Sequence, residues 1–151
     1  MLSYTCVAFE ELSLKELYNF MALRLEVFAV EQNCPYQDAD GKDLAAWHVM
    51  GKKTDGQIMA YARLIPKGIA YAEYVSIGRV VSHASMRGKG IGRELMEQCL
   101  RFIEALWPGQ PIKISAQAYL VDFYTSLGFK AYGETYLEDG IPHVEMRFSK
   151  G

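Results

Sequence analysis

An apolar run, a glycine-rich turn and a helical pattern follow one another between residues 72 and 106. The run contains YVSIGRVVSH, and the turn is SMRGKGIGREL, residues 85–95. The helix that follows is expected over 91–106 and carries apolar residues on one face: Leu95, Cys99, Phe102 and Leu106. Pro108 and Gly109 end the helix, and PIKISA (111–116) predicts another strand. A strand, a crossover helix and a second strand imply a parallel pair inside a mixed sheet.

The rest of the chain adds strands and helices on both sides of this unit. Ser13 and Glu16 have the spacing of a capping box, and they precede an amphipathic pattern that predicts a helix over 14–28. Asp55-Gly56 and Asp139-Gly140 predict hairpin turns. Further strands are expected at 4–9, 46–52, 57–65, 72–82, 129–136 and 143–149, and a short helix at 118–127. The expected order is β-α-β-β-β-α-β-α-β-β, an α/β fold.

Length and composition predict one globular domain over residues 1–151, with half of its residues hydrophobic. The net charge of −2 gives no reason to expect a nucleic-acid partner. No apolar run approaches the roughly 20 residues that span a bilayer, and the first residues do not resemble a signal peptide. Three widely spaced cysteines, Cys6, Cys34 and Cys99, suit neither a disulfide framework nor a metal site. We therefore expect a soluble cytoplasmic protein without a membrane partner.

The glycine-rich turn predicts an anion site. A helix begins with about four backbone N–H groups that lack intrahelical partners, and glycines let an anion approach them closely. Arg87 and Lys89 add positive charge, so a pyrophosphate would fit this turn. A Walker loop is excluded because Lys89 is followed by Gly90 and not by Ser or Thr, and the glycine spacing also fails the dinucleotide fingerprint. A tight turn without a ligand remains the alternative.

The pattern Arg-x-x-Gly-x-Gly, in Arg87, Gly90 and Gly92, resembles the acyl-CoA pyrophosphate loop of the GNAT superfamily of N-acetyltransferases. IGRVVSHASMRGKGIGRELMEQCL is similar to that family's fourth strand, loop and following helix, and QAYLVDFYTSLGF to its second motif. LRLEVFAVEQNCPYQDADGKDL resembles the ElaA-like branch. In the second motif Gln117 replaces the usual Asn, and Leu120 the usual Ala. The resemblance implies the GNAT acyltransferase fold, a mixed central sheet of about seven strands flanked by helices, with a splay near Val81.

The resemblance also implies acetyl-CoA as co-substrate, without a metal, and transfer of its acetyl group to a primary amine of a small molecule or peptide. Tyr124 would protonate the leaving thiolate. The main chain at Val80 and Val81 would hold the pantetheine arm, and the amide of Val81 would stabilise the oxyanion. The remaining coenzyme contacts would come from Gln117, Tyr124 and the turn: Arg87, Gly88, Lys89, Gly90, Ile91 and Gly92.

Three residues, or a chain of water molecules, are candidates for the general base. We expect His48, on the resemblance to the ElaA-like branch, with His143 and Glu31 as alternatives. Glu31 and His143 are also expected near the acceptor. A non-catalytic acyl-CoA-binding protein and a nucleotide-binding module remain competing functions. The sequence leaves the oligomeric state open, a homodimer included.

Charged residues in the front half are expected to have ordinary roles. Three aspartates in DADGKD, residues 38–43, do not fit an EF-hand, because Val49 stands at the last ligand position. A solvated acidic loop is therefore expected there, or an acidic lid that attracts cationic amines. Arg24 and Arg63 would be solvated or paired, and Arg79 would form an ion pair.

Overall fold

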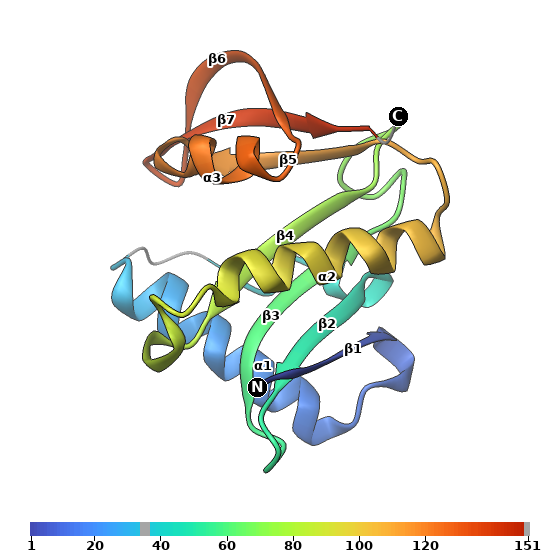
Figure 1. Ribbon diagram of the computed structural model, residues 1–151, viewed down its shortest axis with the longest axis vertical. Helices are drawn as coiled ribbons and strands as arrows, with labels where there is room; N and C mark the ends of the chain where they lie inside the picture. Colours follow the sequence, from blue (N-terminus) through green and yellow to red (C-terminus); the bar gives the residue numbers. More distant parts are fainter. Residues whose placement is uncertain (34–36, 150–151) are drawn as a thin grey trace.

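Two antiparallel sheets form the centre of the computed structural model, which describes residues 1–33 and 37–149 (Figure 1). The first sheet has the order β1-β2-β3-β4 and the second the order β5-β7-β6. The strands of the first are β1 (Ser3–Ala8), β2 (Trp47–Lys52), β3 (Ile58–Ile65) and β4 (Ser76–Ser82). Those of the second are β5 (Ile112–Gln117), β6 (Lys130–Glu138) and β7 (Ile141–Phe148).

A short parallel contact joins the two sheets. Val75 bridges Ile112, and two backbone hydrogen bonds flank this bridge: Lys113 N–H to the Val75 carbonyl, 3.0 Å, and Val75 N–H to the Pro111 carbonyl, 3.1 Å. Beyond it β4 and β5 diverge (Figure 1). The expected mixed sheet of seven strands is thus confirmed, and its splay begins directly after Val75, with Val81 in the open part.

Helices cover both faces of the first sheet. α2 (Ile91–Leu106) packs Leu95, Met96 and Cys99 into a core that includes Val49 of β2. α1 (Leu14–Arg24) packs Phe20 and Leu23 into a second core with the next residue of β2, Met50. Neighbouring residues of a strand point to opposite faces, so the two cores lie on opposite sides of the sheet.

Shorter helical segments position the loops around the sheets. They are η1 (Phe9–Glu11), the π-helical η2 (Leu25–Glu31), η3 (Lys42–Ala45), η4 (Ala84–Met86), η5 (Ala118–Leu120) and α3 (Val121–Ser126). None of the helices formed by residues 1–33 and 37–149 is long and apolar enough to cross a membrane. Cys34 lies outside the described residues.

Most expected elements shift by only a few residues, and two differ more from the sequence prediction. The helix expected over 14–28 is α-helical only to Arg24 and continues to Glu31 as η2, with wider turns. The strand expected over 72–82 begins at Ser76. Tyr71 and Tyr74 lie before it and place their rings 4.5 and 5.4 Å from the Lys113 ammonium, so these residues pack as a connection.

Candidate active site

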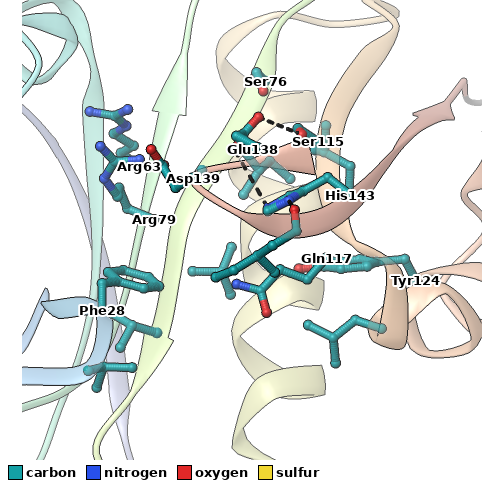
Figure 2. A pocket seen from close by; sticks show the side chains of 18 of the residues that line it. Phe28, Arg63, Ser76, Arg79, Ser115, Gln117, Tyr124, Glu138, Asp139 and His143 are labelled. Carbon is teal, nitrogen blue, oxygen red and sulfur yellow. Dashed lines mark hydrogen bonds and ion pairs between the residues drawn. The ribbon is translucent and has the colours of Figure 1, made fainter. Parts of the chain in front are cut away.

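A cavity of about 760 Å³ lies where β4 and β5 diverge. Its walls come from β4, β5, β7, η2 and α3, and Figure 2 shows side chains from several of these elements directed into it. Seven of the expected site residues line it: Glu31, Val80, Val81, Arg87, Gln117, Tyr124 and His143. Segments far apart in the sequence therefore meet in one hollow.

A β-bulge shapes the β4 wall. Val81 pairs with Tyr61, and Gly78 pairs with Arg63. Between these two pairs β4 advances by three residues and β3 by two, so β4 contains one extra residue. Arg79 lies within the bulge and has a φ of 50°, a left-handed conformation that is uncommon for a residue other than glycine. Asp38 holds its guanidinium, with Nε to Oδ1 at 2.9 Å. The bulge interrupts the ladder at Val80, next to the cavity.

The glycine-rich turn opens α2 at the side of the cavity. Gly88 and Gly90 have φ values of 79° and 74°, and a side chain built at either position would meet nothing within 4 Å. Gly90 is the residue that caps the start of α2. Of the turn, Arg87 lines the cavity, whereas the expected coenzyme residues Gly88, Lys89, Gly90, Ile91 and Gly92 lie outside its lining.

Arg87 and Glu31 bind each other. Arg87 Nη1 donates to Glu31 Oε1 at 2.6 Å, and Nη2 donates to Oε2 at 3.2 Å. The pKa of the Glu31 carboxyl is lowered, chiefly by its hydrogen bond from Arg87. Glu31 was expected at the acceptor end, and the structure places it beside the arginine of the glycine-rich turn.

Tyr124 lies on α3 in an apolar environment. Its side chain packs edge-on against Phe123 and Phe129, with ring centroids 5.1 and 5.8 Å away, and only 7% of the residue is exposed. Burial raises the pKa of Tyr124 to about 12. The phenol is therefore protonated at neutral pH and can donate a hydrogen bond into the cavity.

His48 lies away from the cavity, which argues against its expected role as general base. The residue is fully buried, and its ring stacks on Phe20 at a centroid distance of 5.0 Å. Its Nδ1 contacts the Tyr61 hydroxyl at 2.6 Å, and its Nε2 contacts the Asp43 carbonyl at 3.0 Å. Both nitrogens are occupied, so an acceptor amine would find neither.

His143 on β7 does line the cavity. Its Nδ1 contacts the Ile141 carbonyl at 2.7 Å, and its Nε2 lies 3.6 Å from Glu138 Oε2. Ser115 on β5 hydrogen-bonds the other oxygen of Glu138 at 3.0 Å. Figure 2 shows these three side chains on one wall, with Arg63 and Arg79 on the opposite wall.

The three aspartates of residues 38–43 form ion pairs with arginines. Asp38 and Asp43 are buried and bind Arg24, whose side chain is fully buried, at 2.9 and 2.8 Å. Asp40 binds Arg63 at 2.7 Å. The expected solvated loop is thus wrong for Asp38 and Asp43, whereas Asp40 is exposed and ion-paired. Arg24 and Arg63, for which solvation or pairing was open, are both paired. Within residues 1–33 and 37–149, no group of three or more acidic, His or Cys side chains is arranged to hold a metal.

Comparisons with known proteins agree with this geometry. The sequence model of the acetyltransferase (GNAT) domain matches residues 24–150. The chain is 46% identical to the protein ElaA of Escherichia coli K12 over 138 residues, which cover 90% of this chain and 89% of ElaA.

Solved structures of similar proteins superpose over almost the full length. The crystal structure of an acyl-CoA N-acyltransferase from Pseudomonas aeruginosa gives a TM-score of 0.92 at 47% identity, covering 98% of this chain and 99% of that one. The crystal structure of Escherichia coli ElaA gives 0.91 at 42% identity, with the same coverage. The chain therefore belongs to the GNAT acetyltransferase family, and ElaA is among its relatives.

Proposed function

We propose that the protein is an acetyl-CoA-dependent N-acetyltransferase that acetylates a primary amine of a small molecule or peptide. The observation that carries this proposal is the cavity between β4 and β5. It brings Val80, Val81, Gln117 and Tyr124 to one space, with Arg87 at its side. These are the positions that family resemblance assigns to the coenzyme and to the acid.

The residues present suit the two parts of the coenzyme. An extended pantetheine arm can lie along β4, where the bulge at Arg79 interrupts the backbone ladder. The pyrophosphate needs donors and positive charge, which the start of α2 and Arg87 supply. The open space above Gly88 and Gly90 leaves room for its oxygens.

Tyr124 is the acid of the proposed reaction. The amine attacks the thioester carbonyl, and the developing oxyanion accepts a hydrogen bond from the amide of Val81. As the carbon–sulfur bond breaks, the Tyr124 hydroxyl gives its proton to the sulfur. The apolar packing that keeps this phenol protonated also discourages a free thiolate from forming beside it.

Thiol release from acetyl-CoA across a panel of amines tests the proposal. We expect release that depends on one class of primary amine and yields the N-acetyl product by mass spectrometry. Coenzyme binding without release for any amine would favour the non-catalytic acyl-CoA-binding protein. Thermal stabilisation by ATP or NAD but not by CoA would instead indicate the nucleotide-binding module.

A further inference from the structure

His143 is held in one tautomer by the backbone at the start of β7. Its Nδ1 lies 2.7 Å from the Ile141 carbonyl oxygen, which can only accept a hydrogen bond. Nδ1 therefore carries the proton, and in the neutral ring the lone pair is on Nε2. The β7 backbone thus fixes which nitrogen can take up a proton.

Glu138 is placed to stabilise the protonated ring. Its Oε2 lies 3.6 Å from Nε2 of His143, and its Oε1 accepts a hydrogen bond from Ser115 at 3.0 Å. Ser115 in turn meets the Tyr136 hydroxyl, and the Tyr136 ring stacks against the imidazole at 6.3 Å. Three strands therefore support one imidazole.

The imidazole lies at the level of the expected coenzyme contact. His143 pairs with Gln117 in the β5–β7 ladder, so the two side chains share one face of the sheet. Both line the cavity. The titratable and charged groups around the ring are Glu138 and Tyr136 of β6, Asp139 of the hairpin turn, Tyr124 of α3, and Asp40, Arg63 and Arg79 across the cavity.

We propose that His143 is the general base of the proposed reaction and that Glu138 is its positioning residue. Nε2 takes one proton from the acceptor ammonium, and the neutral amine then forms the N–C bond. The carbon–sulfur bond breaks, and Tyr124 gives its proton to the sulfur. The second proton lost by the nitrogen returns to Tyr124 through solvent, and His143 releases its proton to solvent. The products are the amide, the thiol and one proton.

Amine-dependent thiol release at several pH values tests this assignment, which rests on the proposed function. We expect His143→Gln to lower kcat by about 10²- to 10⁴-fold at neutral pH, the range for lost acid–base catalysis. The deficit should shrink as the pH approaches the amine pKa of about 10, because the amine then needs no base. Added imidazole should restore part of the rate of His143→Ala, and CoA affinity should stay unchanged in both variants.

Glu138→Gln should lower kcat less than His143→Gln does. It should also displace the acidic limb of the pH profile of kcat. Glu134→Gln, on the same exposed strand, is the matched control and should change neither. Wild-type protein without amine-dependent release overturns both the proposed function and the base. An active wild type with unchanged kcat and pH profile in His143→Gln overturns only the base.

A different observation carries a second inference. Glu31 occupies both terminal nitrogens of Arg87, the residue that the proposed function assigns to the coenzyme pyrophosphate. Two carboxylate oxygens thus lie where two phosphate oxygens would bind, since a guanidinium can donate two parallel hydrogen bonds to a carboxylate or to a phosphate. The structure assigns Glu31 as an internal competitor that the pyrophosphate must displace.

The competition predicts different results for two ligands. Glu31→Gln should bind CoA about two- to fivefold more tightly than wild type at low salt, the scale of a surface ion pair. Binding of acetyl-pantetheine, which lacks the pyrophosphate, should stay unchanged. Glu26→Gln, in the same helical segment and exposed, is the control. The gain should vanish when Arg87→Gln is added. Unchanged or weaker CoA binding, or equal gains for both ligands, would refute the competition.

Discussion

The proposed chemistry depends on the hydroxyl group of Tyr124. Tyr124→Phe keeps the ring that packs against Phe123 and Phe129 and removes only the proton donor. We expect kcat to fall by about 10²-fold or more, with CoA affinity little changed, because the ring still fills its place. Steady-state kinetics and isothermal titration with CoA measure the two quantities. A variant with wild-type turnover would show that Tyr124 is only part of the core.

Arg24 is a residue on which folding depends. It is fully buried and binds Asp38 and Asp43, so Arg24→Met would leave two buried carboxylates without this cation. We expect a loss of about 3–5 kcal/mol in the free energy of unfolding, measured by urea denaturation. Lys52→Met breaks the more exposed pair with Glu16 and should cost no more than about 1 kcal/mol. Equal losses in the two variants would contradict the special role of burial.

Single residues were harder to place from sequence than motifs. The resemblance to the ElaA-like branch favours His48 as the base. Alternation in a strand that is covered on both faces does not show whether such a side chain reaches a cavity, and His48 is fully buried. The loop around Asp40 looked solvated because its composition is polar. Its partners Arg63 and Arg79 are on β3 and β4, and local sequence does not encode such distant pairing.

At the scale of elements, periodicity predicted most of what was found. The helix expected at 91–106 is α2 with the same bounds, because a one-sided apolar pattern is bounded by Gly90 and by Pro108. The change from α1 to the π-helical η2 was not predicted, since both carry their apolar residues at similar spacing. The β4 bulge was also missed, because nothing in the sequence around Arg79 marks an extra residue.

The start of α1 has a stabilising element that the sequence did reveal. Ser13 Oγ accepts from Glu16 N–H at 3.0 Å, and Glu16 Oε1 accepts from Ser13 N–H at 2.9 Å. Ser13→Ala should lower the free energy of unfolding by about 1 kcal/mol, since one helix-end N–H loses its acceptor. Ser13→Asp keeps an acceptor and should be close to neutral. Thermal or urea unfolding compares the two, and an equally large loss in Ser13→Asp would argue against capping as the cause.

For the whole molecule, the order of strands and helices predicted a mixed sheet, and the resemblance to the GNAT superfamily implied its splay. The position of the opening depends on the bridge between Val75 and Ile112, which is a contact across 37 residues and has no local signal. The same holds for the cavity wall that carries Glu138 and His143. Motifs therefore predicted the residues of the proposed coenzyme side, and the proposal for the acceptor side needed three-dimensional structure.

The stability of the whole molecule should fall with acid in two stages. Burial lowers the pKa of His48, so the folded state resists a proton that the unfolded chain accepts below about pH 6.5. Stability from this residue is present above that pH and is lost as the pH falls, by at most about 1.4 kcal/mol per pH unit.

The second stage comes from carboxylates. A hydrogen bond from Arg63 lowers the pKa of Asp40, and for Asp43 burial acts in the opposite direction but arginine contacts outweigh it. Both therefore stabilise the fold above their unfolded pKa of about 4, and this stability is lost as the pH falls further. Urea denaturation at pH 7, 5, 4 and 3 measures both stages. His48→Gln should flatten the curve between pH 7 and 5 and keep the lower stage, because the substitution removes the buried imidazole and leaves the carboxylates in place. A first stage that persists in this variant would assign it to another group.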